Sequence, residues 1–471
     1  MTDNREQNSV NQVEPIPVRY WWFKRIAVVA VMLVIVLGGL RWWWGAKAHE
    51  ALQAEIDRIK VTGQPLFPED FDQHPVPDDQ NAALLLKKAV TVFNLTDEQT
   101  ALIGNLRKNP KEISELSKEI QEIIEATAKA RKLVRSARSL PAADWDFKNV
   151  GLSSPAFKFM LHQDLMRILQ AAALYFHNQG KHTEAVETLR DILAYGKHLE
   201  PLRTLLATLL DIHASDLVSE SVEEVVSTLR IADVTTTAKQ SSSRAQIKAL
   251  IKDLSDERAL REGLVWSFYR ERTFQFEAIH LATGKQGGLG ILTIGSQPTP
   301  QGWGIGEYLL FKPAFELDGV RILQQATAMV EAAAAPNWPE ARRRLPPPHG
   351  PPTLQGLKSA SRILGRFIIP SFINTLETTY KPLARRRMAA VALAIRLYEM
   401  DHGKLPEKLD DLVPKYLPAV PADPFADDGR KIGYRPDIDK SVLYSVGPED
   451  KKDPTKRKSV VFPLKSNLPK E

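Results

Sequence analysis

Residues 165–195 read LMRILQAAALYFHNQGKHTEAVETLRDILAY, and this stretch decides the fold class. Apolar side chains recur at helical spacing on both sides of the polar segment NQGK, a pattern that predicts two helices joined by a tight turn. Gly180 suits the turn because glycine adopts positive φ angles without steric cost. The small side chains of Ala173 and Ala185 allow the two helices to approach each other closely. The stretch therefore predicts a helical hairpin.

This hairpin resembles one repeat of a tetratricopeptide-type array. The likeness rests on NQGKHTEA followed by Leu189 and Ile192. Folds of this kind need about three repeats to bury their faces, so we expect the helices that follow, through Leu260, to complete a stack. Stacked hairpins present a concave face to peptides or proteins. The alternative is an all-helical core that binds no ligand.

A second helical segment, NPKEISELSKEIQEIIEATAKARKLVRSARSL, covers residues 109–140. Asn109 is a predicted N-cap and Pro110 occupies the first turn. Its apolar seam repeats in steps of three and four, which predicts contact with a neighbouring helix along one narrow stripe. Because the seam is short and Pro141 follows it, we expect a hairpin within the chain in preference to a coiled-coil dimer. The seam residues are Ile113, Leu116, Ile120, Ile123, Thr127, Ala130 and Val134.

An uncharged apolar run lies near the N-terminus. The 15 residues from Ile26 to Leu40 carry no charge, and as a helix they would span about 22 Å. Aromatic residues at 21–23 and 42–44 extend the run to about 36 Å and suit the two headgroup interfaces of a bilayer. We therefore predict a transmembrane helix over residues 21–44, which contacts the lipid bilayer through Ile26 to Leu40. A cleaved signal peptide and a buried core helix are the alternatives, and the first is disfavoured because Arg41 and three tryptophans stand where a small-residue cleavage site belongs.

Basic residues set the expected orientation of this helix. Arg19, Lys24 and Arg25 precede the span closely, whereas Arg41 and Lys47 follow it. Because cytoplasmic flanks carry the excess of Lys and Arg, the N-terminus is expected in the cytoplasm and the body on the outer, periplasmic or extracellular, side. An outer location argues against contact with chromosomal nucleic acid, although the chain is basic.

Composition narrows the classes of chemistry. The chain of 471 residues has a formal net charge of +6 and no cysteine, which excludes disulfides, thiol nucleophiles and thiolate-bound metals. Much of the positive charge lies in the last 21 residues, and we interpret 448–471 as a solvated basic tail.

The C-terminal part begins with a helix and ends in strands. From residue 385 the helix RRRMAAVALAIRLYEMDHG has one apolar face and ends at Gly403, a left-handed cap. A short second helix is predicted after Pro406. Residues 431–435 and 442–446 alternate in polarity around PDIDKS, which predicts a β-hairpin.

The motif order from Ala384 to Gly447 resembles the C-terminal domain of type II secretion major pseudopilins. It comprises A-x-x-L-Y-x-x-D-H-G-x-x-P, then L-x-x-L, Y-L-x-x-x-P-x-D-P-F and L-Y-S-V-G. The resemblance implies calcium binding in the following loop, where Asp450 and Asp453 are weak candidates because the loop GPEDKKDPTKRK is rich in lysine. This sequence departs from the family in that its membrane span lies far upstream of the module and contains no glutamate. An anchor, a helical body and this module in that order are similar to the arrangement in uncharacterised bacterial membrane-anchored proteins.

No catalytic signature stands out. G-x-S-x-G, S-x-x-K and H-E-x-x-H are absent, and the glycine-rich loop 283–306 fails both phosphate-binding patterns, so we interpret it as an inter-helix loop or a partner-binding loop.

His177 and His182 flank the Gly180 turn, where polar side chains are ordinary. The arginine triplets at 342–344 and 385–387 are interpreted as solvated helix faces, with an acidic partner as the alternative. The adjacent carboxylates at 410–411 and 427–428 are assigned to solubility, and those of Asp401 and Asp423 to turns and caps.

The predicted fold is therefore mainly α: an N-terminal transmembrane helix, a repeat-like helical body, and a small C-terminal α+β module with a long helix and an antiparallel β-hairpin. Its predicted segments are a tail (1–20), the span (21–44), a stalk with a proline-rich linker (45–80), the helical body (81–345), a proline-rich breaker (346–353), the helix and pseudopilin-like module (354–447) and the basic tail (448–471).

The expected function is a non-enzymatic role in the bacterial envelope, in protein binding or scaffolding, with a link to secretion. We predict no catalytic residue, no cofactor, no nucleic acid and no small-molecule substrate. A filament component of a type II secretion or pilus system is the first alternative, and a hydrolase whose site is assembled from scattered residues is the second.

Overall fold

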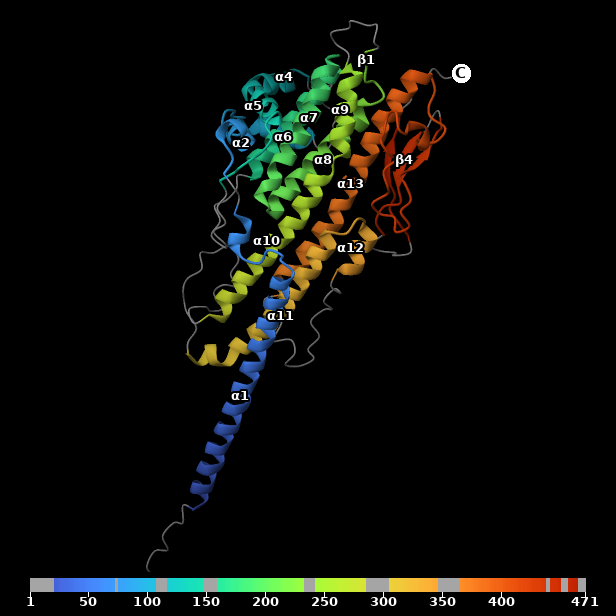
Figure 1. Ribbon diagram of the computed structural model, residues 1–471. Helices are drawn as coiled ribbons and strands as arrows, with labels where there is room; N and C mark the ends of the chain where they lie inside the picture. Colours follow the sequence, from blue (N-terminus) through green and yellow to red (C-terminus); the bar gives the residue numbers. More distant parts are fainter. Residues whose placement is uncertain are drawn as a thin grey trace, which may run out of the picture.

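The computed structural model describes residues 21–72, 75–106, 117–146, 159–232, 242–284, 305–345, 365–437, 441–449 and 456–464. These residues form one long apolar helix, a helical body and a small antiparallel sheet (Figure 1), which confirms the predicted mainly α fold class. The predicted N-terminal tail, the breaker 346–353 and residues 285–304 of the glycine-rich loop lie outside the described residues.

The helices are α1 (Trp21–Val61), α2 (Ala82–Ala89), α3 (Asp97–Leu106), α4 (Ser117–Ala126), α5 (Ala128–Arg138), α6 (Phe159–Asn178), α7 (His182–Leu199), α8 (Leu205–Val225), α9 (Arg244–Ser255), α10 (Arg258–Thr283), α11 (Ile305–Ala333), α12 (Trp338–Arg344) and α13 (Gly365–His402). The strands are β1 (Ile231–Ala232), β2 (Ser242–Ser243), β3 (Gly433–Arg435), β4 (Val442–Ser445) and β5 (Val460–Pro463). Short 3₁₀ helices lie at Pro68–Phe71, Asp78–Gln80, Glu200–Leu202 and Leu409–Leu412.

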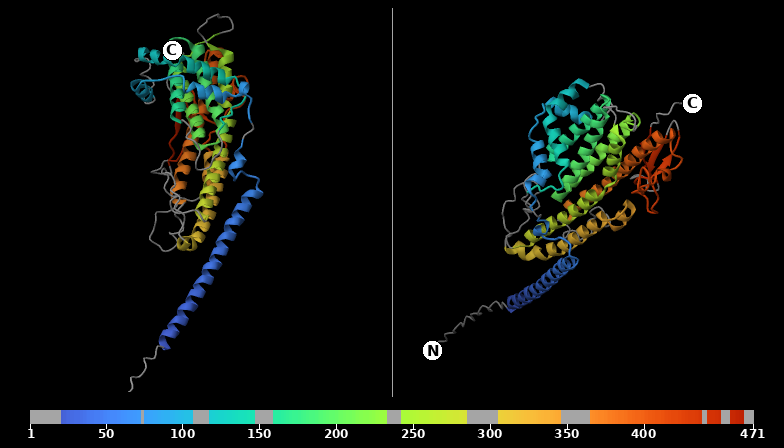
Figure 2. Two further views of the ribbon diagram at one scale, coloured as in Figure 1. Left: turned by 90° about the vertical axis from the view of Figure 1, so that its left-hand side faces the viewer. Right: turned by 45° about the horizontal axis from the view of Figure 1, so that its top comes forward.

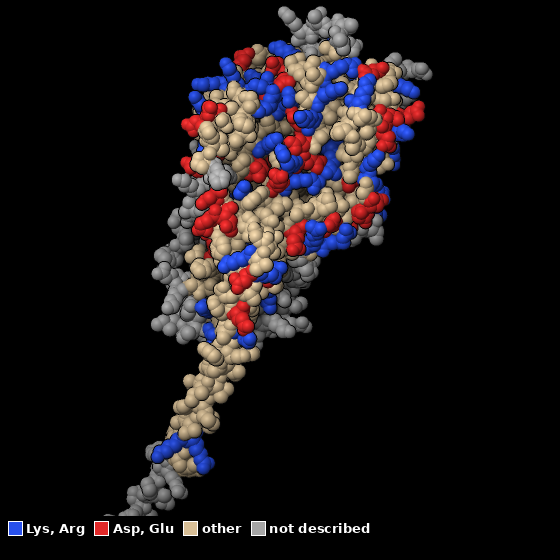
Figure 3. All heavy atoms as spheres, in the orientation of Figure 1, with Lys and Arg blue, Asp and Glu red and all other residues tan. Residues whose placement is uncertain are grey.

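Helix α1 combines the predicted span and stalk in one unbroken element. Its first part is apolar, exposed and long enough to cross a membrane, and in Figure 3 it projects from the body with Lys and Arg gathered at its far end. Its last turns lie against α11, where Leu52, Ile56 and Ile59 are buried. The segment that follows is packed against the body, because Leu66 and Phe71 are also buried.

The hairpin predicted for residues 165–195 is confirmed. Helices α6 and α7 pack against each other around Gly180, whose φ is +72°. Helix α7 in turn packs against α8, and α8 against α10 and α13, so the helices form a layered bundle (Figures 1 and 2).

The predicted helix at 109–140 is two helices where the structure describes it. Thr127 separates α4 from α5, and its hydroxyl donates to the Ile123 carbonyl at 2.7 Å. The seam consequently divides between two cores: Ile120 and Ile123 pack toward α6, whereas Ala130 and Val134 join the main core. These contacts lie within the chain, as expected.

The C-terminal module is a three-stranded antiparallel sheet in the order β3-β4-β5, which packs on α13. The hairpin of β3 and β4 matches the prediction. The interpretation of 448–471 as a solvated tail is wrong for β5, because Val460, Phe462 and Leu464 are buried. The main hydrophobic core includes side chains of α2, α5 to α13 and β5, so the module and the helical body share one interior.

Candidate functional site

A polar cavity of about 310 Å³ lies between α5, α7, α8, α9, α10 and α13. Four cationic side chains and three carboxylates line it together with His198. No serine, threonine, tyrosine or cysteine is among the lining residues that the structure describes, so none of these side chains supplies a hydroxyl or thiol nucleophile to the cavity. The charged lining residues are Arg138, Arg190, Lys197, Arg386, Asp211, Asp253 and Asp256.

Helix α7 supplies one wall. Arg190, Leu193, Ala194 and Lys197 are spaced three or four residues apart and therefore lie on one face of the helix. His198 is buried, and its burial lowers the pKa of its imidazole to about 4. The imidazole is thus neutral at physiological pH and adds no charge to the wall.

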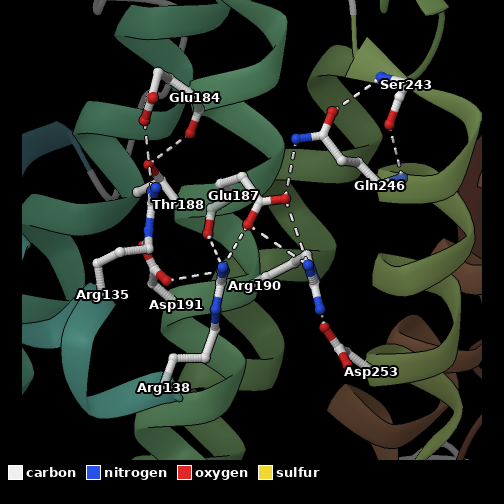
Figure 4. A network of polar contacts seen from close by, with 10 residues as sticks. All are labelled: Arg135, Arg138, Glu184, Glu187, Thr188, Arg190, Asp191, Ser243, Gln246 and Asp253. Carbon is white, nitrogen blue, oxygen red and sulfur yellow. Dashed lines mark hydrogen bonds and ion pairs between the residues drawn. The ribbon is translucent and has the colours of Figure 1, made fainter.

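A network of ion pairs closes one end of the cavity (Figure 4). Asp191, almost fully buried on α7, pairs with Arg135 and with the Nη1 atom of Arg138 at 2.9 Å. Arg138 also pairs with Glu187. Arg190 lies one turn after Glu187 on α7, and its Nε atom donates to Asp253 of α9 at 2.7 Å. The network therefore joins α5, α7 and α9 through charge-assisted hydrogen bonds, which are stronger than neutral ones.

Arg386 of α13 closes the other side, and it is buried. Its guanidinium donates to the carbonyls of Leu254, Asp253 and Asp256 and to the hydroxyl of Ser215, at 2.7–2.8 Å. The last carbonyls of a helix have no partner within the helix, and Arg386 provides partners for those at the end of α9. It also brings a positive charge to the negative end of the helix dipole.

Asp211 of α8 is the carboxylate that this arrangement leaves without a donor. It is only 5% exposed, and the described side chains Arg386 and Lys197 act on it through their charges and not through a hydrogen bond. Burial raises its pKa to about 6, partly offset by the charges of Arg386 and Lys197. Gly196 makes room for it, because a β-carbon there would lie 2.3 Å from the Asp211 Oδ1 atom. Asp211 can therefore hold a proton, and the charged lining of the cavity suits a small polar ligand.

The interpretation of residues 385–387 as a solvated face is wrong. Arg385 binds three carboxylates of α8, and Arg387 binds the Glu257 carboxylate at 2.6 and 2.7 Å. Together with Arg386 they attach α13 to the body. The triplet at 342–344, by contrast, is exposed, as predicted. The partners of Arg385 are Asp216, Glu220 and Glu223, at 3.4, 3.2 and 2.9 Å.

The two turn histidines differ from the expectation of ordinary polar turn residues. His177 and His182 are buried, with 3.1 Å between their Nδ1 atoms, and His177 Nε2 lies 2.8 Å from the Thr228 hydroxyl. Burial, with a smaller contribution from His182, lowers the pKa of His177 to about 4. Among the described residues no group of three or more metal-ligating side chains occurs. Through Thr228 the pair links the hairpin turn to the segment that follows α8.

The remaining carboxylates have structural partners. Asp423 is buried and accepts from the Ser445 hydroxyl at 2.6 Å and the Val446 amide at 2.7 Å, so it fixes the start of the sheet. Asp401 pairs with Arg244 of α9 at 2.6 Å, which adds a second link between α13 and the body. The calcium candidates Asp450 and Asp453 lie outside the described residues.

Sequence reasoning missed Asp211 and assigned Arg386 to a solvated helix face. One signal was available for Asp211, because it interrupts the apolar stretch LLATLLDIHA of α8, where an isolated acid must be buried or face a cavity. Comparisons with family models, curated proteins and solved structures find no match to this chain.

Proposed function

We propose that this protein is a single-pass, membrane-anchored scaffold of the bacterial envelope whose body lies outside the cytoplasm and presents the C-terminal module to a protein partner. The observation that carries the proposal is the continuity of α1, which leaves the exposed apolar stretch and enters the body without a break. A rigid helix of this kind fixes the height and direction of whatever it carries.

Contacts along α1 support a rigid attachment. His49 Nδ1 lies 3.1 Å from Glu316 Oε1, and Gln324 donates to Glu55 at 3.3 Å. After the helix ends, Arg272 of α10, fully buried, donates to Gln64 Oε1 and to the Pro65 carbonyl, both at 2.8 Å. The anchor and the segment after it are thus held by α10 and α11.

The attachment of α13 supports the same role at the other end. Its arginines 385–387 bind α8, α9 and Glu257, and the amide of Trp338 donates to the Pro424 carbonyl at 2.8 Å. A pseudopilin-like link to secretion remains part of the proposal through the motifs at 384–447. Burial of α13 within the body favours a scaffold over a filament subunit, whose long helix would have to pack against other subunits.

The absence of cysteine from the chain permits a sharp test of anchoring and orientation. In cells with a permeabilised outer membrane, Met160→Cys, at a side chain that is 60% exposed on the body, should react with a membrane-impermeant maleimide. Ser9→Cys should react only after lysis. The reverse pattern overturns the orientation, and release of the chain by alkaline extraction overturns the anchor.

Partner presentation is tested separately by site-specific photocrosslinking in cells. A photoreactive residue at Val461 of β5, 50% exposed, or at Lys404 should give a discrete adduct of constant size, whereas one at Lys248 of α9 serves as an exposed control. Adducts absent at both module positions, or equal at Lys248, contradict the presenting role.

A further inference from the structure

We propose that the membrane-facing end of the α10–α11 pair is a second lipid contact, in which Leu281 and Phe311 enter the headgroup layer beside α1. This inference rests on the proposed anchoring of α1. The inference goes beyond that anchoring because it assigns contact with the membrane surface to the body itself.

The contacts between the helices give the height of this end above the span. A β-carbon on Gly45 would lie 3.7 Å from Pro313 Cγ, so Pro313 is level with the residue that follows Trp44. The pairs His49–Glu316 and Glu55–Gln324 show that α11 runs parallel to α1. The N-terminal end of α11 therefore lies at the aromatic end of the span.

The chain changes direction at this level. Pro313 lies inside α11, and a proline within a helix removes a hydrogen bond and bends it. Figure 1 shows the first turns of α11 directed aside from the axis of α1, and so along a membrane surface that α1 crosses. Their sequence, IGEYLLFK at 305–312, is mostly apolar with one acid and one lysine, a composition typical of helices that lie in the interface.

Exposed apolar side chains mark the same end. Phe311 and Leu281 are each 46% exposed. A β-carbon on Gly319 would meet Ile279, and Arg272 donates to the Thr327 hydroxyl at 3.2 Å, so α10 runs antiparallel to α11. Leu281 therefore lies about 6 Å above Pro313 by helical rise. The polar layer of a bilayer is about 5–8 Å thick on each side and begins near Trp43 when the ~30 Å hydrocarbon core is centred on the span. Phe311 therefore falls within this layer, and Leu281 lies at its outer edge.

Phe274 supplies a matched control from the same helix pair. It is 37% exposed, but it lies seven residues before Leu281 on α10, which is about 10 Å farther from the bilayer. The side chains of Leu281 and Phe311 should contact lipid headgroups, whereas that of Phe274 should not.

The experiment uses the full chain, reconstituted in phosphatidylcholine–phosphatidylglycerol vesicles, with single cysteines at Leu33, Leu281, Phe311 or Phe274 that carry an environment-sensitive fluorophore. Lipids spin-labelled on the headgroup should remove most of the emission at positions 281 and 311 and leave that at 274. Lipids spin-labelled on the acyl chain should quench position 33 in the span.

The outcomes separate the two proposals. No quenching at position 33 overturns the anchor. Quenching at 33 with equal emission at 281, 311 and 274 overturns the lipid contact alone. A blue-shifted emission at 281 and 311 that headgroup spin labels do not quench shows that protein, for example a second copy, covers this end, and also overturns the inference.

Discussion

Substitution of Arg386 by methionine tests whether the arginine triplet of α13 holds the body together. Methionine preserves much of the length and apolar volume of the side chain but removes all four hydrogen bonds to Leu254, Asp253, Asp256 and Ser215. Three carbonyls at the end of α9, of which that of Leu254 is buried, then lose this donor. The carboxylate of Asp211 also loses one of the positive charges that offset its burial.

The magnitude follows from the burial of the group. Hydrogen bonds to charged groups contribute about 1.5–3 kcal/mol each, but they are not additive when they share one side chain. Removal of one member of a buried, fully hydrogen-bonded charged group costs about 3–5 kcal/mol. For a cooperative unit of roughly 400 residues, whose unfolding entropy is about 2.1 cal/mol/K per residue, that loss lowers Tm by roughly 4–6 °C.

The second triplet offers the control. Arg343 is exposed on α12 in the same Arg-Arg-Arg context, and Arg343→Met should change the free energy of unfolding by less than about 0.5 kcal/mol. Arg386→Lys should lie between the two, because a lysine keeps the charge but not the planar fork of donors. The assay is denaturant and thermal unfolding in detergent, followed by circular dichroism. Equal losses for Arg386→Met and Arg343→Met would refute the argument that α13 is attached through Arg386.

Three further substitutions test the cavity and the anchor junction. Burial raises the pKa of Asp211 from 3.8 to about 6, so the folded protein loses stability as pH rises through this window. Asp211→Asn should therefore stabilise the protein by at most about 3 kcal/mol above pH 6 and by little at pH 4. A Tm difference between variant and wild type that does not change with pH contradicts this. Gly196→Ala should destabilise by about 1–3 kcal/mol because its β-carbon would meet Asp211, and an unchanged unfolding midpoint would show that the cavity wall yields. Arg272→Met should release Gln64 and Pro65 and speed limited proteolysis there, with cleavage followed by mass spectrometry; an unaltered cleavage rate would mean that other contacts hold this segment.

Elements that depend on local periodicity could be predicted from the sequence. The hairpin of α6 and α7 and the apolar half of α1 follow from spacing and composition, and the end of α13 at His402 follows from Gly403, whose φ is +66°. Strand β5 was missed although Val460, Phe462 and Leu464 alternate with a period of two, because the surrounding lysines dominated the interpretation.

The candidate site could not be predicted because its residues come together only through tertiary packing. The triplets at 342–344 and 385–387 have the same sequence, and nothing local distinguishes the exposed one from the buried one. What separates them is the presence of Asp216, Glu220 and Glu223 on a helix more than 160 residues away in the chain.

The unbroken course of α1 also couples the rotation of the body to the membrane. In a continuous helix each inserted residue turns everything beyond it by about 100° and lifts it by about 1.5 Å. One residue added between Leu40 and Trp44 would therefore rotate the exposed end of α10 and α11 by about 100° about the axis of α1. Seven added residues would restore the original orientation at a height about 10 Å greater. The face that the protein turns toward its neighbours in the membrane is thus set by the phase of a single helix.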